Sequence, residues 1–514
     1  MTELSRRNFS KTILFTGLSA VMLSAAACSP KDASGGANGG ASNKTLTLAV
    51  DADYIGFDPA KQQSGGTVVQ IWQAVWDTLL KYNPDGEIVP NLAESFEMND
   101  DNTVLTMKLR AGVKFTDGTA VDAAAAKASI EHMKTGGGSD ASRVAKLTVE
   151  APDATTLVLT SPEPNGLMPT FMCLSTGIVA STASLTAANR DQMPVGSGPY
   201  TLDAAATTTG ATYSFVRNPN YWNKDAFPFE KVAFKILLDI TARVSALKSG
   251  QVNAAPATSQ TSAELKGSGL NLVENKVNWA GLFLGDRNGK TIPALGQVKV
   301  RQAMNMVFDR AGIIKALFQG NGSVTNQIFN DKSEAFLPDA INQYPFDVEK
   351  AKSLMAEAGF GDGFDLTIPS LNGLDYANPI ITQQLGLLNI RVTEKKLSGG
   401  TAILEILSGK YPVFFFTLES RTALWDIVQA LAPDAVWNIT KDQDPALTPL
   451  INKAQTLKGA EAKANAQAIN KFLIDNAWFS PWALPTAFYA TDKATAASPV
   501  LGSVVPYLFT FTAK

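Results

Sequence analysis

The chain has 514 residues, of which 45% are hydrophobic and 18% carry a charge, which is enough for a large buried core and about three domains. Its formal net charge of −3 excludes the strongly basic surface typical of nucleic-acid-binding proteins. The sequence holds one histidine, His132, so a metal site built from several histidines is excluded as well.

The N-terminus has the pattern of an export signal. Residues 5–11 read S-R-R-N-F-S-K, a twin-arginine pattern, although the basic segment of an ordinary signal peptide is an alternative. Residues 12–27 are apolar but shorter than the roughly 20 residues that span a bilayer. Three alanines precede Cys28, which resembles a lipobox; an ordinary signal peptide with an incidental cysteine is the alternative. We therefore expect a signal peptide over residues 1–27 and a lipid on the sulfur of Cys28.

A spacer follows the signal. Residues 28–43 are rich in Gly, Ser, Ala and Asn and hold no aromatic residue, so they bury too little to offset the entropy of ordering and should form a flexible tether. Signal and tether together predict an exported protein, anchored by lipid to the outer face of the cytoplasmic membrane, at the cell surface or in the periplasm. With Cys28 modified, Cys173 has no disulfide partner and is expected to be a small buried residue.

The first part of the globular region alternates between strand and helix patterns, at residues 46–50, 67–80, 103–109 and 121–133. Asp51 and Asp53 follow the first strand but lack the ligand order of a calcium-binding loop. His132 lies on the second helix, where a lone histidine is far more often a packed or surface residue than a ligand.

A tight turn and an aromatic corner lie near the middle of the chain. Residues 194–200 read P-V-G-S-G-P-Y, so glycine and proline form a turn that leads into a strand. Residues 211–217 alternate as a strand does, residues 218–220 break it, and Tyr221 and Trp222 follow as a rigid aromatic pair. The pattern predicts a hairpin with a packed corner and carries no catalytic chemistry.

The second half carries the strongest helical patterns. Residues 298–320 predict two helices, of which the second is capped by Asp309 and ends at Gly320. Asp347 caps a further helix over residues 348–358. The glycine-rich run after that helix is not a dinucleotide loop, because such a loop lies between a strand and a helix.

Two more helices and an aromatic strand are predicted toward the C-terminus. Thr448 is placed to cap the first helix, with Pro449 at its first position, and residues 460–475 form the second. Residues 476–489 read as an aromatic strand that is broken by prolines.

Four motifs together resemble those of one protein family. They read P-V-G-S-G-P-Y with R-N-P-N-Y-W, P-N-L-A-E-S-F, L-R-A-G-V-K-F-T-D-G, and V-R-Q-A with D-R, within residues 194–222, 90–96, 109–118 and 300–310. In these motifs the chain is similar to the family 5 extracellular solute-binding proteins. Those are the dipeptide and oligopeptide receptors of ABC importers, and the family also has nickel-, haem- and sugar-binding members. The resemblance covers essentially all of residues 44–514.

The resemblance implies an α/β, two-lobed periplasmic-binding-protein-like fold (type II, cluster C) with mixed sheets, flanking helices and an extra subdomain. The ligand would bind between two lobes that close around it. Two segments would cross between the lobes, one beginning at Trp279 and one within residues 476–489. The implied division of the chain is residues 44–75, 186–278 and 486–514 for lobe I, residues 76–185 for the extra subdomain and residues 279–485 for lobe II.

Four aromatic residues become candidate ligand contacts by resemblance, with core packing as the alternative. Tyr54 and Phe57 lie in the loop after the first strand, which faces the ligand cleft in the family. Trp279 begins the crossing into lobe II, and Phe416 lies on the strand of residues 411–417.

The segment after that strand departs from the peptide binders. In those relatives a D-Y-x-D-P-like segment follows, and its first aspartate pairs with the α-ammonium of the peptide. Here the chain reads L-E-S-R-T-A-L-W-D, with Arg421 roughly at the position of that aspartate. A guanidinium cannot bind an ammonium and suits a carboxylate or phosphate, although Glu419 could still take the ammonium. We expect Glu419, Arg421 and Trp425 to line the cleft; a surface ion pair beside a core tryptophan is the alternative.

These expectations describe a monomeric binding protein without catalytic residues, metal, cofactor or nucleic-acid partner. It would capture a peptide, or an anionic or amine-free small molecule, and deliver it to the permease subunits of an ABC importer. Two other classes stay open on the sequence: a carboxylate-pair glycoside hydrolase, and a structural or chaperone-like surface lipoprotein. A serine hydrolase does not, because residues 196–198 read G-S-G and do not form a G-x-S-x-G motif.

Overall fold

The computed structural model describes residues 45–371, 373–397 and 402–514, which belong to one compact unit, Ser42–Lys514. The expected signal peptide, the lipidation site at Cys28 and the tether over residues 28–43 lie outside the described residues. Within the described ranges, no helix is long and apolar enough to cross a membrane.

A mixed sheet forms the core of the part that we call lobe I, which is built on β1 and β8 to β11. Strand β1 (Thr45–Val50) pairs in parallel with β10 (Lys231–Ile236) and β11 (Ala254–Ala257). The antiparallel strands β9 (Thr212–Arg217) and β8 (Tyr200–Leu202) continue the sheet beyond β10. The other elements of lobe I are α1 (Val68–Val75), α5 (Ile240–Lys248), α6 (Ser259–Gly267), β19 (Thr495–Ala496) and β20 (Thr512–Ala513).

Between α1 and β8 the chain forms a subdomain around a second sheet, in the order β4-β5-β7-β6 with all neighbours antiparallel. Helix α2 (Ala123–Thr135) packs on β6 and β7. It is capped by Asp122, whose carboxylate accepts a hydrogen bond from the Ala125 N–H at 2.8 Å. The bounds of the other subdomain elements are β2 (Leu80–Tyr82), β3 (Ile88–Pro90), β4 (Ala93–Met98), β5 (Val104–Leu109), β6 (Thr148–Glu150), β7 (Thr156–Thr160), α3 (Met168–Phe171) and α4 (Thr182–Leu185).

Lobe II, built on β13 to β17, packs helices around its part of the large sheet. In α7, Val300, Ala303 and Met304 are buried, as their helical spacing predicts. The elements of lobe II are β13 (Asn278–Leu284), α7 (Val298–Met306), α8 (Arg310–Phe318), β14 (Gly322–Val324), α9 (Val348–Glu357), β15 (Asp365–Leu371), α10 (Asn378–Gly386), β16 (Arg391–Leu397), α11 (Ala402–Leu407), β17 (Val413–Glu419), α12 (Ala423–Ala430), α13 (Thr448–Ala454) and α14 (Gly459–Asp475).

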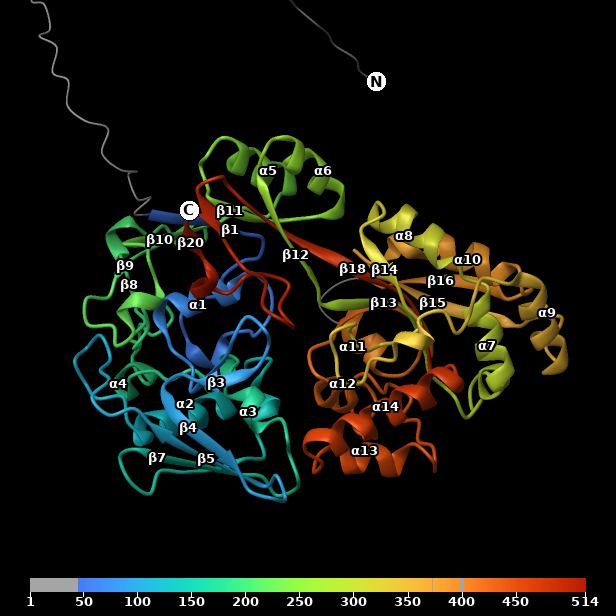
Figure 1. The fold of residues 1–514 in the computed structure, drawn as a ribbon, viewed down its shortest axis with the longest axis horizontal. Coiled ribbons are helices and arrows are strands. Elements are labelled where there is room, and N and C mark those ends of the chain that lie inside the picture. Colours follow the sequence, from blue (N-terminus) through green and yellow to red (C-terminus); the bar gives the residue numbers. More distant parts are fainter. Residues whose placement is uncertain (1–44, 372, 398–401) are drawn as a thin grey trace, which may run out of the picture. The chain divides into compact units, whose positions relative to one another are not determined.

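Two neighbouring stretches of strand connect the lobes. Strand β12 (Asn271–Lys276) pairs with the second half of β18 (Phe479–Thr491), and β13, separated from β12 only by Val277, pairs with its first half. Figure 1 shows β12 in green and the long β18 in red passing between the two halves. The strand order β17-β13-β18-β11-β1-β10-β9-β8 therefore runs through both lobes as one ten-stranded sheet, with β12 and β14 off that path.

Strand β18 is continuous where the sequence predicts a break. Its register with β13 shifts between Ala280 and Gly281, which leaves Trp482 as the extra residue of a β-bulge. A proline lacks the N–H that a regular ladder needs, and the bulge accommodates Pro481 at this point.

Helix ends confirm two predicted caps and contradict one. The carboxylates of Asp309 and Asp347 each accept a hydrogen bond from the first turn of the helix that follows. Thr448 is instead the first helical residue of α13, and its side chain makes no cap. Its N–H donates to the backbone carbonyl of Asp444 at 2.8 Å, so a backbone turn starts this helix.

The first helix is shorter than its sequence predicts, because it ends at Val75 and not at Leu80. The N–H groups of Leu79 and Leu80 donate to the carbonyls of Gly177 and Met172, at 2.9 and 3.0 Å. Contacts with a distant segment therefore replace the helical hydrogen bonds that the local pattern favours.

The aromatic corner is organised around the buried carboxylate of Asp77. It accepts hydrogen bonds from the Ser197 hydroxyl, the Tyr221 hydroxyl and the Trp222 indole N–H, at 3.1, 3.0 and 3.0 Å. Burial raises the pKa of Asp77, and these three hydrogen bonds counteract the shift. The two aromatic residues therefore hold a carboxylate between the subdomain and lobe I.

The two glycines of the preceding turn are required by a close approach of backbone. A Cβ at Gly196 would lie 2.1 Å from the Val75 carbonyl oxygen, and a Cβ at Gly198 would lie 2.4 Å from the Val75 carbonyl carbon. The N–H of Gly198 also donates to that oxygen at 2.8 Å. The turn thus fixes the end of α1.

Candidate ligand-binding site

Two of the seven candidate residues lie in the core of lobe I. The Tyr54 and Phe57 rings meet edge to face, with centroids 5.1 Å apart, and both rings pack on Tyr213 of β9. Phe57 is 2% exposed. The hydroxyl of Tyr54 is buried and makes no hydrogen bond within the described part of the chain.

Two others lie in an aromatic cluster of lobe II. Trp279 of β13 is buried against Phe283, with ring centroids 4.9 Å apart. Phe416 of β17 packs on Trp437 at 4.5 Å. Both residues therefore pack among other aromatic rings where the sheet enters lobe II.

The remaining three candidates come together where β17 meets α12. Glu419 is the last residue of β17, and Trp425 lies in the first turn of α12, which Thr422 caps by accepting a hydrogen bond from the Trp425 N–H at 3.2 Å. Arg421 lies between them. Its Nε is 2.5 Å from Glu419 Oε1, and its guanidinium lies 5.4 Å from the centre of the Trp425 ring. This brings a cation, an anion and an indole into contact.

A buried carboxylate holds this segment in place. Asp426 accepts hydrogen bonds from the Ser420 hydroxyl at 2.6 Å and from the Arg421 N–H at 3.4 Å. Gln429 donates to the same carboxylate at 3.2 Å. Burial raises the pKa of Asp426 well above the ordinary value of an aspartate. The backbone that carries Arg421 is therefore fixed from within lobe II.

Residues of the other lobe and of the subdomain face this segment. The Arg143 guanidinium, from a short 3₁₀ turn at Ala141–Arg143, lies 5.1 Å from the centre of the Trp425 ring. Trp425 also belongs to the hydrophobic cluster of lobe I and the subdomain, which includes Tyr82 and Tyr507. A Cβ at Gly502 would lie 2.8 Å from Cγ of Arg421. The two lobes therefore meet at Arg421 and Trp425.

Several polar atoms of this cluster are buried without a hydrogen-bond partner among the described residues. They are Arg421 Nε and Nη1, Trp425 Nε1, the Tyr82 hydroxyl and Glu419 Oε1. Arg421 Nε and Glu419 Oε1 are held together as an ion pair, whereas Arg421 Nη1, Trp425 Nε1 and the Tyr82 hydroxyl have no such contact. A buried polar atom without a partner costs about 1–3 kcal/mol, so such atoms collect where a ligand supplies the missing contacts.

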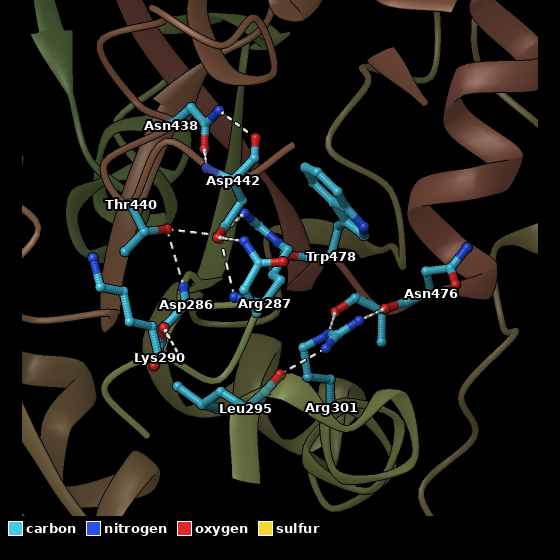
Figure 2. A network of polar contacts seen from close by, with 12 residues as sticks. Asp286, Arg287, Lys290, Leu295, Arg301, Asn438, Thr440, Asp442, Asn476 and Trp478 are labelled. Carbon is cyan, nitrogen blue, oxygen red and sulfur yellow. Dashed lines mark hydrogen bonds and ion pairs between the residues drawn. The ribbon is translucent and has the colours of Figure 1, made fainter. Parts of the chain in front are cut away.

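Figure 2 shows that two other buried arginines of lobe II donate hydrogen bonds to groups of the protein itself. Arg287 donates to the Asp442 carboxylate at 2.9 Å and to the Trp478 carbonyl at 2.7 Å. Arg301 donates through Nη2 to the Asn476 carbonyl at 2.9 Å. These arginines tie loops to the sheet, whereas Arg421 has N–H donors without an acceptor among the described residues.

The charges of the cluster act on each other. Burial raises the pKa of Glu419, and the positive charges of Arg421 and Arg143 counteract that shift in part. Burial also raises the pKa of Tyr82 and of Tyr507, so both phenols are neutral and can donate a hydrogen bond.

A small cavity adjoins the cluster on the side of lobe I and the subdomain. Its volume is about 40 Å³, and its lining includes Trp76, Lys81, Tyr82, Cys173 and Tyr507. This volume is enough for a few water molecules. Tyr82 and Tyr507 thus lie both in its wall and beside Arg421.

Sequence reasoning found three members of the cluster and missed Arg143, Tyr82 and Tyr507. No local pattern marks these three, because they come from segments far apart in the chain. Elsewhere in the described residues, no group of three or more His, Cys, Asp or Glu side chains is arranged to hold a metal ion. His132 instead contacts the Asp58 carboxylate at 2.7 Å.

Comparison with known proteins identifies a family and a relative that spans most of the chain. The family model of the bacterial extracellular solute-binding proteins, family 5 (middle), matches residues 87–422. The glutathione-binding protein GsiB of Pectobacterium atrosepticum is 25% identical over 491 residues, which cover 88% of this chain and 90% of the relative.

Two solved structures share the fold. The binding protein AgaA from A. tumefaciens R10, in complex with agropinic acid, has a TM-score of 0.75 and 25% identity over 91% of this chain and 99% of its own. HbpA2 from Haemophilus parasuis has a TM-score of 0.78 and 22% identity over 91% of this chain and 100% of its own. The two-lobed fold with mixed sheets is thus that of the periplasmic binding proteins.

Proposed function

The chain belongs to family 5 of the bacterial extracellular solute-binding proteins, and we propose that it is the lipid-anchored receptor of an ABC importer. It captures a small solute between its two lobes at the Arg421 cluster and delivers that solute to the permease subunits. As in other binding proteins of this kind, the ligand must stabilise the closed arrangement more than the open one, because equal affinity for both would shift nothing.

The binding site is proposed from the buried N–H groups of Arg421 and Trp425 that have no hydrogen-bond acceptor among the described residues. Arg421 is 5% exposed, and Trp425 is 8% exposed. Their N–H groups are therefore shielded from bulk water, and an acceptor on a bound molecule would satisfy those that lack a partner. This supports a solute that carries an acceptor-rich group, such as a carboxylate.

The names of two relatives fit such a solute. GsiB is a glutathione-binding protein, and AgaA was solved with agropinic acid. We propose that the natural ligand is likewise a small peptide-like or organic acid. Neither alternative class, the glycoside hydrolase or the chaperone-like lipoprotein, is favoured by membership of a family of binding proteins.

Thermal unfolding tests the receptor function. The full chain in detergent would be heated with a library of peptides, opines, organic acids, sugars and metal chelates. A ligand at a hundredfold its Kd adds roughly 2.7 kcal/mol of stability, so a binder raises the melting temperature visibly. Arg421→Ala should weaken binding of each compound that carries a free carboxylate by about tenfold or more, because the charged donor is lost. If no compound in any class raises the melting temperature, the receptor function is wrong.

A further inference from the structure

We propose that Arg143 and Arg421 form a clamp, one arm from each side of the cleft, that binds an anionic oxygen group of the solute over the Trp425 ring. The proposal rests on the function proposed above and adds the class of ligand: a solute with a free carboxylate, or an oxyanion of the same charge. It also adds Arg143 as a ligand contact and assigns the anion a part in closing the lobes.

The first support is the position of the two guanidiniums. Arg143 lies 5.1 Å and Arg421 lies 5.4 Å from the centre of the same indole ring. Arg143 comes from the subdomain, and Arg421 follows β17 in lobe II. A tryptophan ring attracts cations, so Trp425 holds both guanidiniums near one another.

The second support is the balance of donors and acceptors. Outside the Arg421–Glu419 ion pair, the buried atoms of the cluster without a partner among the described residues are Arg421 Nη1, Trp425 Nε1 and the Tyr82 hydroxyl. All three can donate a hydrogen bond. A carboxylate offers two oxygens with about four lone-pair sites and no donor, and therefore complements this set.

The third support is the way in which the nearby carboxylates are used. Asp140 accepts hydrogen bonds from the hydroxyls of Ser64 and Ser175, at 2.5 and 2.6 Å, and pairs with Arg143 at 2.9 Å. Glu419 pairs with Arg421. Neither carboxylate is free to receive a ligand ammonium, which would also approach two guanidiniums. The site therefore disfavours the free amine that an aspartate at the position of Arg421 would bind.

The clamp links the choice of ligand to the closing of the two lobes. An anion between the two guanidiniums contacts a donor from each side at once, so it gains its full set of contacts only when the lobes are together. A solute that lacks the anion gains only part of the contacts in the closed form, so it shifts the equilibrium less.

Matched pairs of probes test the clamp. Isothermal titration of the full chain in detergent would compare glutathione, agropinic acid and a panel of di- and tripeptides, each as the free acid and as its amide at every carboxylate. Free acids should bind at least about tenfold more tightly than their amides, the range of a charge-assisted hydrogen bond. Amides that bind as tightly as the acids would overturn the clamp while leaving the receptor function intact. If no compound of the panel or of the wider library binds, the proposed receptor function itself is wrong.

Variants assign the effect to the two arginines. Arg143→Gln and Arg421→Gln should each weaken the free acids by about tenfold or more and leave the weak binding of the amides unchanged. Arg391→Gln is the matched control, because Arg391 is exposed and pairs with Asp365 on the distant β15–β16 pair. The melting temperature of each unliganded variant checks folding. Parental affinity for the acids in a folded Arg143→Gln variant would overturn the proposal.

Discussion

At the scale of single residues, the structure gives a physical reason for the two arginines of the V-R-Q-A and D-R motifs. Arg301 and Arg310, from the V-R-Q-A and D-R motifs, both donate to backbone carbonyls. Arg310 alone contacts the carbonyls of Thr325, Pro481, Asn305 and Tyr344 and the Asn305 side chain. It thus ties α8 to β18 and to the loop before α9, so its role is structural.

Arg310→Met should destabilise the protein strongly. Removing the guanidinium leaves several buried acceptors unpaired, and a loss of about 3–5 kcal/mol in the free energy of unfolding is expected. Urea denaturation measures it. Arg391→Met is the control, because the exposed ion pair with Asp365 should contribute less than about 1 kcal/mol. Equal losses in the two variants would contradict the structural role of Arg310.

Asp426 predicts a dependence of stability on pH. Its pKa in the folded protein is raised by burial, so the folded state holds this proton at pH values where the unfolded chain has released it. Its contribution to stability is therefore present at low pH and is lost as the pH rises above the ordinary aspartate value of about 3.9. Asp426→Asn imitates the protonated form and should lose less stability between pH 5 and pH 8 than the parent, by urea denaturation. Parallel pH profiles of the two proteins would count against this assignment.

At the scale of elements, the sequence pattern predicts those helix and strand boundaries that depend on neighbouring residues alone. The alternation in residues 211–217 gives β9, the cap at Asp347 gives the start of α9, and Gly250 lies just past α5 with a positive φ of 74°, as a helix end requires. The end of α1 at Val75 and the continuous β18 were not predictable in this way, because distant backbone groups determine both.

In the candidate site, too, residues close together in the sequence were predictable and residues brought together by the fold were not. Glu419, Arg421 and Trp425 lie within seven residues, so a departure from one family motif is enough to predict all three as candidates. Arg143, Tyr82 and Tyr507 reach the same place only through the fold, and their own neighbourhoods in the sequence give no signal. Tyr54, Phe57, Trp279 and Phe416 remain predictions as ligand contacts, and the structure buries or packs each of them among other aromatic rings.

Gly198→Ala tests the turn that fixes the end of α1. A methyl group there would lie 2.4 Å from the backbone carbon of Val75, which cannot rotate away. A loss of about 3 kcal/mol in the free energy of unfolding is expected, from urea denaturation. Gly386→Ala, at the last helical residue of α10 with no atom within 4 Å of the new methyl, should be neutral or stabilising by up to about 1 kcal/mol. Tolerance of alanine at Gly198 would show that the turn can shift.

At the scale of the whole molecule, the proposed anchor gives the receptor a fixed place beside its permease. A lipid on Cys28 would hold the globule by residues 28–43, whose composition favours a flexible coil. The site at Arg421 would then face solute outside the membrane while the receptor stays near the importer.

Cys28→Ser should release the protein from the membrane. The parent chain is expected in the detergent phase of a Triton X-114 partition, because its acyl chains insert into micelles, and the variant in the aqueous phase. Cys173→Ser is the matched control, since the buried Cys173 thiol should leave the partition unchanged. Detection of both variants in the detergent phase would contradict lipidation at Cys28.

Strand β18 belongs to both lobes yet lies late in the sequence, at Phe479–Thr491. While a ribosome is still making the chain, β11, β12, β13 and β14 all lack the neighbour that they later share. Neither lobe can complete its sheet before nearly the whole polypeptide has been synthesised, and the open strand edges invite pairing with other chains. Folding should therefore be slow and essentially post-translational, so the unfinished chain depends on chaperones that cover its open strand edges.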